Sequence, residues 1–391
     1  MTRLLTLLIG RLPIGWLQLS HNKTRMAAAL AGVAFANVLV FVQLGILGAL
    51  NGTIATTYNP LDADILVSAN DANTFSDGSP IPRRYMYRSM SIPGVEAAAP
   101  LYIGKVDWTR ADGSSASLQV YGLPPEALRF VSAELAEPFQ LLKLQDAVLM
   151  DTGTRGIEPG ELDGISPRTP MRFEIKGHTL NAVGTFSIGG GFNADGNMIV
   201  SDQTFLRLFP QRLSGTPSHI LIKTVSGEDA ETVSDRLRSQ LTSAPVKIRP
   251  LDKAIAEDVR YQTTERPIGV IFGFGVFIGI LVGIVIVYQV LTSDVADHIR
   301  EYATFKAIGY EHRFFLGIIT EEAVILAVLG FVPGVFLSSV IYAAMASATD
   351  LPVAMDTGRA FVVFAGTLLT CTLSGFIATR RLAAADPADL F

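Results

Sequence analysis

Four long hydrophobic runs recur along the chain and are separated by more polar stretches. The runs cover residues 26–50, 267–291, 323–347 and 360–379, and none of them contains Asp, Glu, Lys, Arg or His. A helix needs about 20 predominantly apolar residues to cross the hydrocarbon core of a bilayer, so each run is long enough. The pattern predicts an α-helical membrane protein with four transmembrane helices.

A long, more polar stretch, 51–266, separates the first hydrophobic run from the second. It is large enough to bury a core of its own. Its first half alternates short apolar segments with turn residues, and Asp112-Gly113 between two such segments predicts a β-hairpin. We therefore expect a large α+β domain inserted between the first and second transmembrane helices.

The second half of this stretch has a different pattern. Residues 219–224, 229–241 and 246–249 are typical, in order, of a strand, an amphipathic helix and a second strand. We place a subdomain boundary near 200–205. Residues 252–266 are expected to form a helical stalk that leads into the second transmembrane helix.

Lys and Arg residues gather at particular ends of the hydrophobic runs. Residues 1–25 contain four of them and no acid, the 380–391 tail begins with two, and the 350–359 turn contains only Arg359. Because Lys and Arg are enriched in cytoplasmic loops, both termini and the 294–313 connection are expected in the cytoplasm. The 51–266 domain and the 350–359 turn are then periplasmic, and residues 1–25 form a helix at the membrane interface.

The 294–313 connection reads DVADHIREYATFKAIGYEHR. Val295, Ile299 and Tyr302 fall on one side of a helical wheel, and charged residues fall on the other. Gly309 is expected to end the helix, because glycine adopts the left-handed conformation without steric cost. We interpret the segment as a short amphipathic helix on which a partner acts; a charged juxtamembrane turn with no partner is the alternative.

Other polar and small residues flank or interrupt the runs. Asn37 and Gln43 are expected to form hydrogen bonds between helices rather than to line a pore. Glu321-Glu322 are expected to be solvated or to contact a cytoplasmic partner. Glycines four residues apart predict a packing face that meets either another helix or a second copy of the chain. These glycines are Gly269, Gly273, Gly275, Gly279 and Gly283.

Composition supports the membrane assignment and excludes several other classes. The chain is 49% hydrophobic and 17% charged, with a mean hydropathy of +0.38, whereas soluble proteins carry roughly 25% charged residues. The net charge of −5 gives no reason to expect nucleic acid as a partner. The single cysteine, Cys371, excludes an intrachain disulfide.

Candidate chemistry is sparse. The glycine-rich loop 187–191, expected to be a flexible surface loop, is not followed by the Gly-Lys-Ser/Thr of a phosphate-binding loop. His178 and His219 are isolated in the sequence and belong to no Ser/His/Asp grouping. We therefore expect neither an enzyme nor a cofactor or metal bound by this chain.

The order of one transmembrane helix, a large external domain and three further helices resembles the permeases of the MacB/FtsX superfamily of ABC transporters, the type VII or mechanotransmission transporters. Four stretches are similar to the DevC branch, the permease subunit of DevBCA-type exporters. They are residues 15–45, 59–67, 92–102 and 300–310. The terminal DPADLF also resembles the usual ending of the family.

The resemblance implies an ATP-driven exporter. The permease would be a homodimer in the bacterial inner membrane, in contact with membrane lipid, and a separate ATP-binding subunit would hold ATP and Mg. The external domain would engage a periplasmic HlyD-like membrane-fusion adaptor that joins a TolC-like outer-membrane channel. The substrate would be a lipid, a glycolipid or another amphiphile.

The helical-wheel pattern and the resemblance together assign coupling to the ATPase to one set of residues. They are Val295, Ile299, Arg300, Glu301, Tyr302, Phe305, Lys306, Ala307, Ile308, Gly309 and Tyr310. Two relatives with another output remain as alternatives. One is an FtsX-like transmitter of signals to cell-wall hydrolases, and the other is a Lol-type permease that releases lipoproteins and pairs with a different permease.

Overall fold

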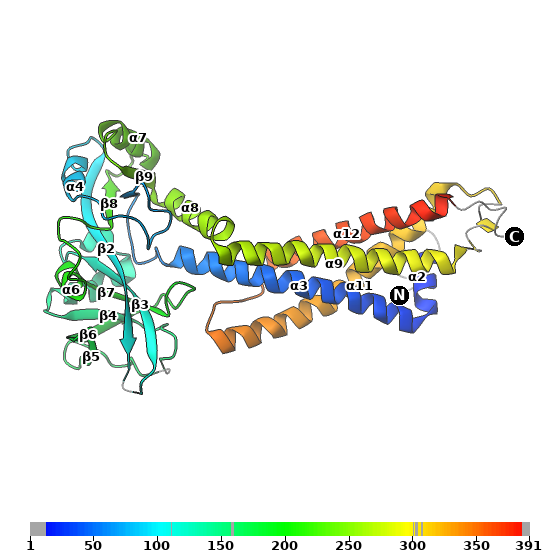
Figure 1. Cartoon of the computed structure of the whole chain (residues 1–391), viewed down its shortest axis with the longest axis horizontal. Coiled ribbons are helices and arrows are strands. Elements are labelled where there is room, and N and C mark those ends of the chain that lie inside the picture. Colours follow the sequence, from blue (N-terminus) through cyan, green and yellow to red (C-terminus); the bar gives the residue numbers. More distant parts are fainter. Residues whose placement is uncertain are drawn as a thin grey trace. The chain divides into compact units, whose positions relative to one another are not determined.

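The computed structural model describes residues 13–110, 112–157, 160–299, 301, 304–305 and 308–384. The chain divides into two compact units (Figure 1). The helical unit combines Met1–Ala49 with Pro267–Phe391, and the sheet unit is Leu50–Arg266.

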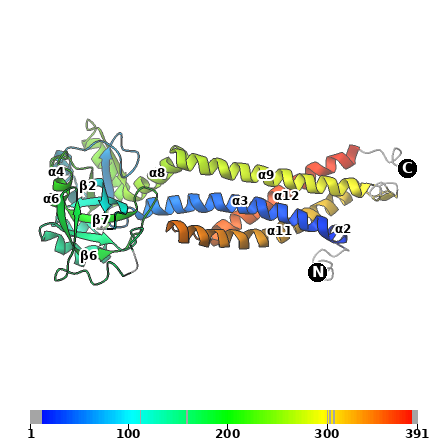
Figure 2. The ribbon, with the colours of Figure 1, turned by 60° about the horizontal axis from the view of Figure 1, so that its bottom comes forward.

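The helical unit contains a short helix α2 (Ile14–His21) and the long helices α3 (Lys23–Thr56), α9 (Pro267–Asp297), α11 (His312–Thr349) and α12 (Thr357–Ala384). These four long helices each contain a segment that is long and apolar enough to cross a membrane, which confirms the predicted number. α12 packs against both α9 and α11 (Figure 2). α11 continues through Pro333 as one helix.

The N-terminal interfacial helix predicted over 1–25 lies partly outside the described residues. Its described part is α2, which packs against α11: the α-carbon of Gly15 lies so close to α11 that an added Cβ would be 2.9 Å from the carbonyl oxygen of Ile318. Asn22 ends α2 and starts α3, because its side-chain Oδ1 accepts a hydrogen bond from the Arg25 backbone N–H at 3.2 Å.

The described residues of the sheet unit form nine strands in the order β5-β6-β4-β7-β3-β2-β8-β1-β9. They are β1 (Ile65–Ala69), β2 (Val95–Thr109), β3 (Ser115–Leu123), β4 (Ala147–Asp151), β5 (Met171–Ile175), β6 (His178–Phe186), β7 (Gly196–Ser201), β8 (His219–Thr224) and β9 (Val246–Pro250). Its helices are α4 (Arg84–Ser89), α5 (Ala136–Phe139), α6 (Asp202–Leu208), α7 (Ala230–Gln240) and α8 (Leu251–Thr264), with 3-10 turns η1 (Leu128–Phe130), η2 (Ala133–Leu135) and η3 (Gln140–Lys143).

The predicted hairpin is present. β2 and β3 pair antiparallel from Tyr102↔Gly122 to Thr109↔Ser115. Gly113 in the turn has φ +85°, a left-handed value that glycine adopts without strain. The strand–helix–strand pattern of the second half is also present, as β8, α7 and β9, but β1 lies between the two strands and pairs antiparallel with both. The unit is therefore a split βαβ arrangement rather than a continuous one.

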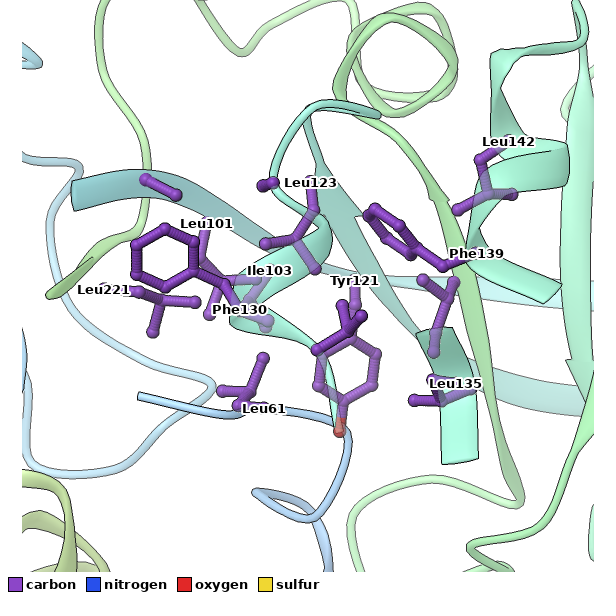
Figure 3. Packing of buried hydrophobic residues seen from close by; sticks show 14 of the residues in the cluster. Leu61, Leu101, Ile103, Tyr121, Leu123, Phe130, Leu135, Phe139, Leu142 and Leu221 are labelled. Carbon is purple, nitrogen blue, oxygen red and sulfur yellow. The ribbon is translucent and has the colours of Figure 1, made fainter. Parts of the chain in front are cut away.

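The core of the sheet unit draws on both halves of the chain. In the cluster of Figure 3, Leu101 and Ile103 from β2, Tyr121 from β3 and Leu221 from β8 pack together and are all less than 5% exposed. A second cluster beneath β8 and β9 contains residues of β1 and α4, which precede the boundary expected near 200–205. That range holds the end of β7 and the start of α6. The second core cluster therefore contains residues from both sides of the expected boundary, and the sheet unit does not divide into two subdomains at residues 200–205.

Candidate functional site

The apolar side of the 294–313 connection packs inside the chain. α9 continues to Asp297, so Val295 belongs to this long helix and is 3% exposed, in a cluster with Leu291 and Phe315. Ile299 and Phe305 are half-buried against the same cluster. These three residues complete the helical core instead of offering an apolar face to a partner, which corrects the docking face expected from the helical wheel.

The stop predicted at Gly309 is confirmed. Gly309 has φ +103°, and the Tyr310 backbone N–H donates to the Phe305 carbonyl at 3.1 Å. This is the bond of a Schellman motif, in which a left-handed glycine ends a helix. The rings of Phe305 and Tyr310 meet edge to face with centroids 5.6 Å apart, which is the hydrophobic contact that accompanies the motif.

Among the described residues of the connection, the turn after this helix end is exposed. Ile308 is 71% exposed and Tyr310 is 45% exposed, and Gly309 and Glu311 beside them are also exposed. We call these four residues the turn surface. Glu301 is exposed as well. The remaining predicted coupling residues, Arg300, Tyr302, Lys306 and Ala307, lie outside the described residues.

A cluster of charged side chains ties three helices together beneath this turn. Arg25 of α3 contacts Asp297 of α9, and its guanidinium lies 3.7 Å from a carboxyl oxygen of Asp294, whose side chain is 4% exposed. Glu322 of α11 faces Asp294. Asp297 and Arg300 are three residues apart, a spacing at which they could pair along a helix, but Arg300 lies outside the described residues.

Glu321 and Glu322 are buried, so the expectation of solvated or partner-binding acids is wrong. Glu321 is 9% exposed and its Oε1 accepts the backbone N–H of Trp16 in α2 at 3.3 Å. Glu322 is fully buried, and its carboxyl group faces the buried carboxyl group of Asp294. Such groups are costly inside a helical bundle and often mark functional sites.

The glycine face of the second run meets α3. An added Cβ at Gly275 would lie 2.4 Å from the Gln43 side chain, at Gly279 3.0 Å from Val40, and at Gly283 3.3 Å from Ala36. Gly273 has open space around it, so it does not contribute to this contact. Gly269 is buried.

The polar residues of the first run behave differently from each other. Thr367 of α12 donates its hydroxyl to Asn37 Oδ1 at 2.5 Å, which confirms the expected hydrogen bond between helices. Gln43 lies over Gly275, and its Oε1 has no hydrogen-bond partner among the described atoms.

A buried polar network joins the two chain segments that enter and leave the sheet unit. Asp258 of α8 is 3% exposed and accepts the Tyr58 hydroxyl at 2.8 Å, the Phe75 backbone N–H at 2.8 Å and the Gln262 side chain at 2.7 Å. The Thr263 hydroxyl donates to Asn51 near the end of α3 at 2.9 Å. We call this set the stalk network, because it fixes the stalk helix α8 to the first residues of the unit.

The electrostatics of the sheet unit follow from burial. Desolvation raises the pKa of Asp258 above its usual range, and the three donors oppose this effect. Burial likewise raises the pKa of Tyr58, which the neighbouring carboxylate raises further. His219 is 1% exposed, and burial lowers its pKa to about 4. His219 is therefore a neutral core residue, as expected, and is not poised as a general base near neutral pH.

The loop 187–191 is held in place rather than free. Asp151 at the end of β4 is fully buried and accepts the backbone N–H groups of Ile188 at 2.9 Å and Gly189 at 3.0 Å. Asn197 donates its amide to the same carboxylate at 2.7 Å. The loop lies at the surface as expected, with Ser187 exposed, but a buried carboxylate that is distant in sequence anchors it by accepting its backbone N–H groups.

Sequence reasoning missed Asp151 and Asp258 and misjudged Glu322, which it expected to be solvated or bound by a partner. Asp151 ends a strand that is buried throughout, and Asp258 lies in the amphipathic helix α8; the burial of both depends on partners far away in sequence. Glu322 directly precedes the hydrophobic run 323–347, and this position is the feature of the sequence that could have indicated its burial. Within the described residues, no group of three or more His, Cys, Asp or Glu side chains is arranged to hold a metal ion.

Comparison with known proteins bears on the helical unit. Residues 273–387, which include most of α9 and all of α11, match the family model described as FtsX-like permease C-terminal. The chain is 21% identical to the uncharacterized ABC transporter permease Rv0072 of Mycobacterium tuberculosis over 378 residues, covering 95% of this chain and 96% of that protein. The chain is similar to ABC transporter permeases.

Another relative is longer. The pyoverdine export ATP-binding/permease protein PvdT of Pseudomonas putida is 27% identical over 202 residues, which are 51% of this chain but 30% of that protein. The chain thus spans less than a third of this relative.

Among solved structures, the periplasmic region of MacB from Actinobacillus actinomycetemcomitans aligns with 50% of this chain and 92% of its own, at 10% identity and a TM-score of 0.35. The extracellular domain of the noncanonic ABC-type transporter YknZ from Gram-positive bacteria aligns with 48% of this chain and 98% of its own, at 10% identity and a TM-score of 0.33.

Proposed function

We propose that this chain is the permease subunit of an ABC exporter of the FtsX/MacB type and belongs to its DevC branch. It works by mechanotransmission with a separate ATP-binding subunit, which holds ATP and Mg. A second copy of the chain completes the permease. A periplasmic HlyD-like adaptor and a TolC-like outer-membrane channel carry the substrate onward, and that substrate is a lipid, a glycolipid or another amphiphile.

The observation that carries this proposal is the match of residues 273–387 to the FtsX-like permease C-terminal family. The end-to-end similarity to an ABC transporter permease supports it. The four apolar helices fit a protein of the inner membrane. We place both termini and the 294–313 connection in the cytoplasm and the sheet unit in the periplasm, on the distribution of Lys and Arg.

We further propose that the ATP-binding subunit contacts the turn surface. Ile308 and Tyr310 are exposed side chains on a turn that is held by the hydrogen bond from the Tyr310 N–H to the Phe305 carbonyl and by the edge-to-face contact of their rings. Tyr310 also packs against Phe314 of α11 with ring centroids 4.5 Å apart, so a push on the turn is transmitted to α11. Exposed aromatic and aliphatic anchors on a rigid support are typical of interface hot spots.

Ile308→Glu tests this contact. The variant chain is expected to insert normally but to lose co-purification of the ATP-binding subunit and to abolish export. Leu213→Glu is the matched control, since Leu213 is 66% exposed in the sheet unit and Ile308 is 71% exposed in the helical unit. Retention of the ATP-binding subunit by Ile308→Glu would refute docking at the turn surface.

Affinity purification from native membranes in mild detergent, with mass spectrometry of the bound proteins, tests the function as a whole. An ATP-binding subunit together with a long-helical periplasmic adaptor supports the exporter. An ATP-binding subunit with a cell-wall hydrolase partner or a second, different permease moves the output to signalling or lipoprotein release. Recovery of no ATP-binding subunit, while a control transporter stays intact, refutes the proposal.

A further inference from the structure

A cavity of about 330 Å³ lies inside the helical unit, between α3, α9 and α12. In Figure 2, α3 and α9 run side by side and α12 passes behind them. The walls of the cavity are mostly apolar. They include Val40 and Leu44 of α3, Val287 of α9 and Val363 of α12. An apolar cavity of about 150 Å³ already stays dry and accepts benzene, so this one has room for a larger apolar group.

The rim of the cavity is formed by exposed apolar side chains. Ile280 of α9 is 41% exposed, and Val362 and Leu369 of α12 are 62% and 61% exposed. In a helix that crosses a bilayer, exposed apolar residues face lipid chains. Where these side chains face the bilayer, the medium at the opening is hydrocarbon, and a group that enters the cavity comes from the lipid phase.

One polar group in the cavity wall lacks a partner. Asn37 is 4% exposed, and its Oδ1 accepts the Thr367 hydroxyl, whereas its Nδ2 has no hydrogen-bond partner among the described atoms. A buried donor left without an acceptor costs about 1–3 kcal/mol. An occupant with an oxygen acceptor would remove this cost, which a purely hydrocarbon occupant would not.

We propose that this cavity binds the apolar chain of a membrane amphiphile that carries a carbonyl or hydroxyl oxygen. The chain packs against the valine and leucine walls, and its oxygen accepts a hydrogen bond from Asn37. The proposal rests on the membrane location in the proposed function. It adds a ligand site within a single copy of the permease.

Gly366 offers a way to fill the cavity without disturbing the helices. It lines the cavity, and an added Cβ would meet nothing within 4 Å, so Gly366→Leu places a side chain in the empty volume. Gly273 is the matched control, because it lies on α9 outside the cavity lining and its Cβ would also meet nothing within 4 Å. Asn37→Val removes the polar contact but keeps the shape of the wall.

The test uses the full chain in nanodiscs of phosphatidylethanolamine and phosphatidylglycerol, doped with a phospholipid that carries a diazirine on one acyl chain. After illumination, peptide mass spectrometry locates the label. Wild type is expected to carry label on the α3 and α12 peptides that line the cavity. Gly366→Leu loses this label, Gly273→Leu keeps it, and Asn37→Val reduces it.

Three results would overturn the proposal. The first is equal labelling of wild type and Gly366→Leu, with thermal unfolding showing both folded. The second is label confined to exposed faces. The third is a disulfide between two copies through Val362→Cys, which would show that a second copy covers the opening. If Gly366→Leu fails to fold, Val362→Trp replaces it in the labelling experiment. The tryptophan blocks the opening of the cavity instead of filling its interior, and the same loss of label is expected. Co-purification of the ATP-binding subunit is measured in a separate experiment. A cavity that binds no lipid can therefore be distinguished from a chain that is not an ABC permease.

Discussion

Acidification is expected to weaken the sheet unit through His219. The ring is buried, its Nε2 faces the Phe75 carbonyl at 2.8 Å, and its Nδ1 faces the Ser68 hydroxyl at 3.2 Å. Because a carbonyl only accepts hydrogen bonds, Nε2 carries the proton and Nδ1 accepts from the hydroxyl. Protonation of Nδ1 would turn this acceptor into a donor in a site without water access. Burial accordingly lowers the pKa of His219 to about 4.

The magnitude follows from linkage between protonation and folding. An unfolded histidine takes up a proton near pH 6.5, whereas His219 in the folded unit does so only near pH 4. Each pH step between these values favours the unfolded chain by about 1.4 kcal/mol, so the full contribution is about 3 kcal/mol. This stability is present above pH 6.5, falls as the pH drops toward 4 and is constant below that. Asp258 acts in the opposite sense, because its raised pKa adds stability as the pH falls.

Hydrogen exchange on the full chain in detergent measures the effect, with peptides of β1 and β8 as reporters and correction for intrinsic exchange. Wild type is expected to lose about 100-fold in protection between pH 6.5 and 4 relative to His219→Gln, since each 1.4 kcal/mol is a factor of ten. His178→Gln is the matched control, because His178 is exposed at the start of β6. An identical pH dependence of wild type and His219→Gln would refute the burial argument.

Further predictions concern the two networks and the turn. Tyr58→Phe removes the hydroxyl that donates to Asp258, which should cost about 1.5–3 kcal/mol in hydrogen-exchange stability of α8; unchanged protection of α8 would contradict the role of the stalk network. Arg25→Met removes the arginine beside the buried Asp294, whose other basic neighbour is His298 at 3.6 Å, and should destabilise the helical unit by about 3 kcal/mol in denaturant unfolding. An unaltered midpoint would count against this cluster. Gly309→Pro should abolish export, since proline cannot adopt φ +103°, whereas Gly309→Ala should retain most of it at a cost of about 1–2 kcal/mol in the turn. Equal transport by the two Gly309 variants would show that the left-handed turn is dispensable.

Features that depend on neighbouring residues were predictable from the sequence. The four apolar helices follow from uninterrupted hydrophobic runs, and the β2–β3 hairpin follows from Asp112-Gly113. The helix end at Gly309 follows from the backbone freedom of glycine. In each case the local structure is decided by residues that are close in sequence to the helix, the hairpin turn or the helix end.

Features that depend on distant partners were not predictable. β1 separates β8 from β9 because of hydrogen bonds to a segment far earlier in the chain, and no local pattern encodes that position. Val295 and Glu322 were misjudged for a related reason. The apolar side of the helix that carries Val295 looks the same in the sequence whether it packs against its own chain or against a partner. Glu322 marks the end of an uncharged run in the sequence whether or not its side chain is buried.

The long strand β2 has a mechanical consequence. Its residues 95–101 pair with β8 and its residues 102–109 pair with β3, so the neighbour changes at the peptide bond between Leu101 and Tyr102. The sheet is thus two half-sheets joined end to end by one continuous backbone. A tensile load along β2 passes from one half to the other through covalent bonds, and no row of hydrogen bonds has to shear.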